Sequence, residues 1–238
     1  MENYKKIEKE LIDTLQLTRR PIAITFCEST PHDVAKFTGT QPSSCSFWRL
    51  ASEGQVFFTE SSDHYNCAIG SYTHNIPLPQ ERTVELEQTL GMMTELGYIK
   101  LEEVPEIPKL EQTPRAIVYA PLADTPKSPD IVLIMGQPGS ISLLHEAALS
   151  AGISTKAPLL GRPTCMALPA TKKGAVVTSL GCIGNRVYTD MENDSCYMTV
   201  AGLDLIVIME HLKKIVTANE ALNKYHQERR QALSASAT

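Results

Sequence analysis

The sequence has no apolar run close to the ~18 residues that a membrane-spanning helix requires. It also lacks a signal-peptide core, because Met-Glu-Asn-Tyr-Lys-Lys leads directly into an amphipathic pattern. Basic residues are in the minority, and the net charge of −5 offers no electrostatic surface for nucleic acid or an anionic membrane. Aromatic residues make up only 6% of the chain. With 42% hydrophobic and 21% charged residues over 238 positions, we expect a soluble, cytoplasmic α/β protein.

Several motifs that carry well-known chemistry are also absent. There is no Cys-x-x-Cys knuckle and no closely spaced ferredoxin run. There is no Gly-x-Gly-x-x-Gly, no P-loop lysine and no His-Glu-x-x-His. A Ser-His-Asp order and a paired-carboxylate motif are missing too. These absences disfavour nucleotide-binding and hydrolase interpretations.

The hydrophobic pattern predicts an α/β fold with a mixed sheet flanked by helices and a long C-terminal helix. Prolines in residues 103–114 suggest a connector between an N-terminal half, 1–102, and a C-terminal half, 115–230, which pack as one compact domain. We expect a disordered tail at 231–238. The expected strands are 22–26, 56–59, 116–119, 131–135, 175–179 and an edge strand at 196–200; the expected helices include 3–18, 44–53, 81–97, 164–172 and 203–229, and residues 60–80 and 181–195 are expected loops.

Four of the six cysteines fall in an internal similarity. Cys45 and Cys165 are followed at the same distance by Gly54 and Gly174, and a short strand comes next in both halves. Each strand leads to a loop with a second cysteine, in Cys67-Ala-Ile-Gly70 and in Cys182-Ile-Gly184. We interpret this as a duplication, with chance as the alternative. A pseudo-two-fold axis would then bring two cysteines from each half to one site.

Four thiols from four separate segments favour an iron–sulfur cluster over a zinc knuckle. We therefore rank a [4Fe–4S] cluster above zinc, and zinc above four buried thiols without a metal. The predicted metal ligands are Cys45, Cys67, Cys165 and Cys182. The remaining two, Cys27 and Cys196, have no partner in the repeat, so we expect neither to be an obligatory ligand.

Other polar residues lie beside these cysteines in the sequence. Arg162 and Arg186 could bind an anionic substrate through a planar fork. The alternative for both is a surface charge or a structural pair with Asp190 or Glu192. Asn185 could orient the substrate or supply a turn. His64 is a candidate proton donor or metal ligand, with a solvated loop histidine as the alternative. Cys27 is a catalytic candidate because it follows the first expected strand and could line the same cavity.

At these residues the chain resembles domain-of-unknown-function family 169, the ArCR family of archaea and anaerobic bacteria. The resemblance covers residues 10–215. It is carried by Cys45 with Gly54, by Asn66-Cys67-Ala-Ile-Gly70, by Gly161-Arg-Pro-Thr-Cys165 and by Ser179-Leu-Gly-Cys-Ile-Gly-Asn-Arg186. It implies a shared metal or thiol site at the four cysteines and a role in anaerobic metabolism.

We expect an iron–sulfur enzyme that acts on a small anionic molecule by redox, sulfur-transfer or Lewis-acid chemistry. The alternative is a non-catalytic metal-binding or redox-sensing protein with a structural cluster or zinc. A small-molecule substrate, a second copy of the chain and an electron-transfer partner are the candidate partners, with nucleic acid and membrane excluded.

Overall fold

The computed structural model describes residues 2–153 and 162–235 and is built around a six-stranded sheet. The strand order is β2-β3-β1-β4-β6-β5, and the five strand pairings are antiparallel. The only parallel contact among these residues is an isolated bridge between Lys36 and Phe58. The α/β class is confirmed. The sheet was expected to be mixed, whereas its five strand pairings are all antiparallel. The strands are β1 (Ile22–Cys27), β2 (Phe57–Thr59), β3 (Ala116–Pro121), β4 (Ile131–Gly136), β5 (Val177–Ser179) and β6 (Cys196–Ala201).

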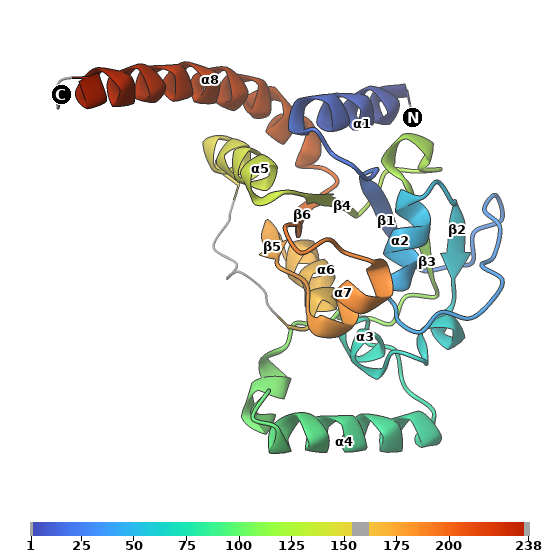
Figure 1. Ribbon diagram of the computed structural model, residues 1–238. Coiled ribbons are helices and arrows are strands. Elements are labelled where there is room, and N and C mark those ends of the chain that lie inside the picture. The colour runs from blue at the N-terminus through green and yellow to red at the C-terminus, as the bar shows by residue number, and fades with distance from the viewer. Residues whose placement is uncertain (1, 154–161, 236–238) are drawn as a thin grey trace.

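Helices cover both faces of this sheet, which gives a layered architecture (Figure 1). One face packs against α1 (Glu2–Leu15), α5 (Pro138–Ser150) and the start of α8 (Leu205–Ala235). The other face carries the shorter helices and the aromatic part of the core. These shorter elements are α2 (Ser46–Ser52), α3 (Ala68–Thr73), α6 (Ala167–Lys172) and α7 (Ile183–Thr189), with the 3-10 turns η1 (Ser61–His64), η3 (Leu122–Asp124) and η4 (Thr164–Met166) in the connections.

The central strand β4 shows how the sequence encodes two covered faces. Val132 and Ile134 lie in the core under α1, α5 and α8, whereas Leu133 lies in the aromatic core on the other side. Successive side chains of a strand point to opposite faces, so a strand covered on both faces must be apolar throughout. Its uninterrupted hydrophobic run therefore reflects its central position in an antiparallel sheet.

The sheet order is compatible with the proposed repeat. On one side of the β1–β4 pair the order is β1, β3, β2, and on the other side it is β4, β6, β5. The duplication itself stays a prediction. β3 falls in the range expected for the C-terminal half and pairs with β1 and β2. The expectation of an edge strand at 196–200 is wrong, because β6 lies between β4 and β5.

Two expected loops contain helices. The segment 60–80 includes η1 and α3, and the segment 181–195 includes α7. Each of these elements is too short to show a helical hydrophobic period, so the pattern gave no signal for them.

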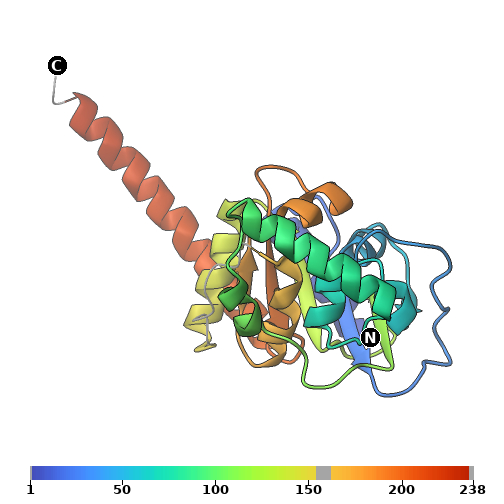
Figure 2. The same ribbon diagram turned by 90° about the horizontal axis from the view of Figure 1, so that it is seen from below.

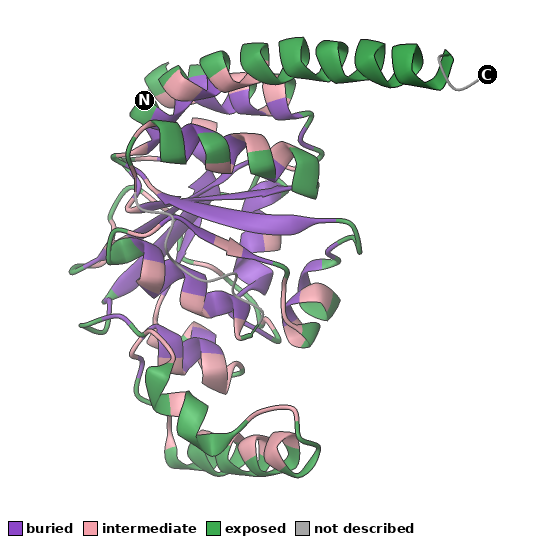
Figure 3. Ribbon diagram, turned by 90° about the vertical axis from the view of Figure 1, so that its left-hand side faces the viewer, coloured by how far each residue is buried: buried purple, intermediate pink, exposed green. Residues whose placement is uncertain are grey.

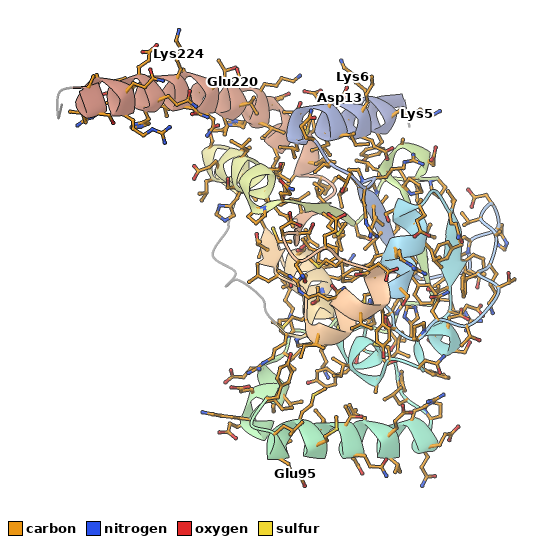
Figure 4. The ribbon with its side chains drawn as sticks, in the orientation of Figure 1. Lys5, Lys6, Asp13, Glu95, Glu220 and Lys224 are labelled. Atoms are coloured by element: carbon orange, nitrogen blue, oxygen red, sulfur yellow. The ribbon has the colours of Figure 1, made fainter. Side chains whose placement is uncertain are left out.

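Two long helices extend from the body. The buried residues of α8 lie in its first turns, and from Asn219 to Ala235 the helix is exposed and projects outward (Figures 2 and 3). Residues 231–235, part of the expected disordered tail, are therefore helical, and 236–238 lie outside the described residues. α4 (Gln80–Glu95), followed by η2 (Leu101–Glu106), has no buried residue. Charged side chains such as Glu95 and Lys224 point away from the body (Figure 4).

Candidate functional site

Each of the four predicted ligands lies at the beginning of a short helix on the aromatic face of the sheet. Cys45, Cys67 and Cys182 are the N-cap residues of α2, α3 and α7. Cys165 lies in η4, which continues directly into α6. The sequence similarity between the halves thus corresponds to a shared local structure, a cysteine followed at once by a helical turn.

Two contacts between segments near the cysteines, and one ion pair between the C-terminal ends of α2 and α7, connect the elements that carry these cysteines. The Cys182 amide donates to Thr164 Oγ1 at 2.6 Å, next to Cys165. The Cys165 Sγ lies 4.0 Å from the carbonyl oxygen of Ile69 on α3. On the other side, α7 is tied to α2 by the ion pair between Arg49 and Asp190, at 2.7 Å. The N-terminal and C-terminal cysteines therefore share one neighbourhood.

Electrostatics shows that the thiols are close enough to influence one another. The pKa of Cys45 is raised to about 12, mainly by burial, and negative charge on Cys67 and Cys182 acts in the same direction, whereas a hydrogen bond from Ser43 acts against it. Burial also raises the pKa of Cys165 well above its ordinary value, and charge on the other three cysteines acts in the same direction. Both buried thiols are therefore protonated at neutral pH in this arrangement.

The four cysteines differ in their access to solvent. Cys45 and Cys165 are buried, whereas Cys67 and Cys182 are only partly buried. Within residues 2–153 and 162–235, no three His, Cys, Asp or Glu side chains are placed to hold a metal ion. The sulfurs are thus neighbours but are not arranged as a ligand set, and their role as ligands stays a prediction.

Three polar side chains on this face of the sheet lack partners. The Tyr119 hydroxyl, the Trp48 indole nitrogen and both amide atoms of Asn185 are buried and have no hydrogen-bond partner among the described residues. Burial raises the pKa of Tyr119, and its side chain packs in the same core cluster as Cys45 and Cys165.

Two histidines lie behind Cys67, with ring centroids 5.4 Å apart. His64 is buried, and its ring nitrogens lie 2.9 Å from Ser44 Oγ and 2.9 Å from Thr59 Oγ1. The solvated-loop interpretation of His64 is therefore wrong, and its role as a proton donor stays a prediction. His74 Nδ1 lies 2.6 Å from the Gly70 carbonyl oxygen, and its buried Nε2 has no partner in the described part of the chain.

The two candidate arginines are placed differently from each other. Arg186 lies on α7, and its guanidinium donates to the backbone carbonyls of Leu180, Glu192 and Ser195. These bonds connect the chain segments before and after α7. They agree with the structural alternative for Arg186, except that its partners are backbone carbonyls and not an acidic side chain. Arg162 is exposed, and its guanidinium lies 4.4 Å from the centre of the Tyr98 ring.

The other two cysteines lie away from the candidate site. Cys27 packs with Phe58, Ala116 and Val118, on the opposite face of β1 from the aromatic core. It therefore does not line the same cavity as the four cysteines, and Lys127 Nζ donates to its sulfur at 3.0 Å. Cys196 belongs to the core under α1, α5 and α8.

Tyr119 and His74 were missed at the level of sequence. Tyr119 stands in the apolar strand Ala-Ile-Val-Tyr, where the pattern indicates only a core residue. A fully buried tyrosine normally finds a partner for its hydroxyl, so its position in a strand buried on both faces was the available signal. His74 carried no signal, because its burial depends on α3.

The fold and the site define an α/β protein in which four cysteines gather on one face of an antiparallel sheet. The chain belongs to domain-of-unknown-function family 169, described as uncharacterised ArCR, which matches residues 10–211. It is also similar to the uncharacterised protein MJ0308 of Methanocaldococcus jannaschii, with 24% identity over 224 residues, 88% of this chain and 94% of that protein. No solved structure matches the chain. Within the described residues, no helix has the length and apolar character needed to cross a membrane.

Proposed function

We propose that the protein is an iron–sulfur enzyme whose [4Fe–4S] cluster is held by Cys45, Cys67, Cys165 and Cys182. The observation that carries this proposal is the gathering of four cysteines, from four separate helix starts, within electrostatic range of one another. Thiolates are the ligands that iron–sulfur clusters use. Zinc is the second candidate, since the same four sulfurs would suit a tetrahedral structural site.

The polar surroundings favour a cluster over zinc. A cluster adds sulfides that can accept hydrogen bonds, whereas a zinc ion held by four cysteines adds no further acceptor. Tyr119 and Asn185 offer such donors within the buried part of the site. When bound, a cluster would supply electron transfer, sulfur-transfer or Lewis-acid chemistry.

Binding requires the cysteines to lose their protons. The raised pKa values of Cys45 and Cys165 mean that protons are released as the metal binds, so affinity increases with pH. The partly exposed Cys67 and Cys182 mark the side from which a small molecule could approach. We propose that this molecule is anionic, with Arg162, Asn185 and Arg186 as the candidate binding residues.

A non-catalytic, redox-sensing protein is the second candidate function. The observation that favours it is the use of Arg186 in three backbone hydrogen bonds, which leaves fewer of its donors for a substrate. An electron-transfer partner, a homodimer and a cytoplasmic location remain part of the proposal.

The ligand assignment is tested by replacing each cysteine with serine and measuring iron and acid-labile sulfide after purification without oxygen. We expect Cys45→Ser, Cys67→Ser, Cys165→Ser and Cys182→Ser each to lower the iron content. Cys27→Ser and Cys196→Ser are matched controls, because both are buried thiols outside the site. Loss of iron in Cys27→Ser with retention in Cys67→Ser would contradict the assignment.

A further inference from the structure

Two helical segments extend from the body of the protein at opposite ends (Figure 1). We call residues 80–106, which comprise α4 and η2, the acidic arm, and residues 213–235 of α8 the basic arm. The acidic arm has seven glutamates and two basic residues, a net charge of −5, which equals that of the whole chain. The basic arm has five basic residues and two glutamates, a net charge of +3. The two arms are therefore electrostatically complementary, and complementary charges steer association.

Both arms also expose large apolar side chains. These are Val84, Met92 and Leu96 on α4, and Leu222, Tyr225 and Leu233 on α8. At about 100° per residue, each set lies within about 120° around its helix, so each forms one apolar side. Helices in proteins are stabilised mainly by packing of such a side, yet α4 has no buried residue and Leu96 is 76% exposed. Each arm thus presents an apolar side that the rest of the described chain leaves uncovered.

The two arms match in length and cannot cover each other within one chain. At about 1.5 Å per residue, α4 is about 24 Å long and residues 219–235 are about 25 Å long. The arms lie at opposite ends of the body and run in a similar direction in the two side views (Figures 1 and 3). A basic arm can therefore meet an acidic arm only in a second copy, and a two-fold axis makes this contact twice.

We propose that the protein forms a two-fold symmetric dimer in which the basic arm of each copy packs on the acidic arm of the other. The inference rests on the proposed function only for the homodimer, and it needs no iron–sulfur cluster. Val84 and Leu96 are 12 residues apart and Leu222 and Leu233 are 11 apart, so the two apolar sides have nearly equal lengths. The charged side chains then flank an apolar centre, as in other protein interfaces.

Charge reversal on each arm tests the pairing. One variant carries Glu87→Lys with Glu95→Lys, a second carries Arg229→Glu with Arg230→Glu, and a third combines all four changes. The four side chains are exposed, and none is in an ion pair among the described residues. Lysine and glutamate are both good helix formers, so the arms stay helical. The dimer dissociation constant is measured by sedimentation equilibrium at low and high salt.

The matched control is Lys5→Glu with Lys6→Glu on α1. Both lysines are exposed and lie outside the two arms (Figure 4). This control changes the net charge of the chain by the same amount as the double change on the basic arm. It therefore separates general repulsion between two negatively charged copies from a loss of pairing between the arms.

We expect the wild type to be a dimer whose dissociation constant rises with salt, because salt screens charges near the surface. Reversal on either arm alone should raise the dissociation constant by about tenfold or more, and the combined variant should return toward the wild-type value. The control should change it less. Leu96→Gln, which removes an exposed apolar side chain, should also weaken the dimer and leave the urea midpoint of the single chain unchanged.

Three results would overturn the inference. The first is a wild type that stays monomeric at all concentrations. The second is a dimer whose dissociation constant is the same in the reversed variants and in the control, since another surface would then form it. The third is weakening by each reversal without recovery in the combined variant. Iron analysis on the same samples separates the two proposals: a dimer without iron contradicts the iron–sulfur function only, and an iron-containing monomer overturns this inference only.

Discussion

Gly70 is the residue at which a single methyl group should disturb the site most directly. It lies in α3, and its amide donates to the Cys67 Sγ at 3.3 Å. A Cβ at this position would lie 2.9 Å from the Cys67 Sγ and 2.8 Å from the Ser44 Cβ, and it would also contact the Ser44 hydroxyl. Ser44 in turn bonds His64, so the added methyl group must displace groups that are already hydrogen-bonded.

The expected magnitude follows from three contributions. Overpacking of this kind costs about 1–3 kcal/mol. A weakened hydrogen bond adds about 1 kcal/mol. Alanine gains back about 1 kcal/mol through its helix propensity. We therefore expect Gly70→Ala to lower the free energy of unfolding by about 1–3 kcal/mol in total and to lower the iron content, because the Cys67 sulfur must move.

Gly91→Ala is the matched control. Gly91 is also inside a helix, α4, but a Cβ added there would meet no atom within 4 Å. It should raise the free energy of unfolding by up to about 1 kcal/mol and leave the iron content unchanged. The assay is urea unfolding followed by circular dichroism, with iron analysis on the same samples. A Gly70→Ala protein that is as stable and as iron-rich as wild type would refute this reasoning.

Two further predictions concern the surroundings of the site. Burial lowers the pKa of His74 to about 4 and that of His64 below 6.5, so both stay neutral in the folded protein while the unfolded chain takes up protons below 6.5. The free energy of unfolding should therefore fall as the pH is lowered from 6.5 toward 4, by about 1.4 kcal/mol per pH unit for each histidine. In urea titrations at several pH values, His74→Gln should show a shallower dependence of this free energy on pH. An unchanged pH dependence would contradict the assignment. Arg186→Lys should lower the free energy of unfolding by about 1–2 kcal/mol, since one ammonium cannot serve three carbonyls, with iron retained; an unaltered urea midpoint would show that these hydrogen bonds do not stabilise the loop.

The sequence was sufficient to predict the elements that have a strong period or a strong apolar run. The helix around Leu86 and Leu90 was predicted within a residue or two of α4, and β4 was predicted from its hydrophobic run. Pairing direction could not be predicted, because an apolar strand covered on both faces looks the same in parallel and antiparallel sheets.

The candidate site, too, could be predicted from the sequence only in part. The repeat indicated which cysteines share a local structure, and the structure places those four on one face. The opposite orientation of Cys27 depends on strand register, and the hydrogen bonds of His64 depend on contacts with Ser44 and Thr59 that are distant in sequence. The unsatisfied hydroxyl of Tyr119 is likewise visible only once the core around it is known.

The most direct test of the central claim is a combined metal, sulfide and spectroscopic analysis of the wild-type protein purified without oxygen. The account predicts iron and acid-labile sulfide in equal amounts. It also predicts a visible absorption that bleaches on reduction and an electron paramagnetic resonance signal from the reduced cluster. Zinc in place of iron, or four free thiols without any metal, would contradict it.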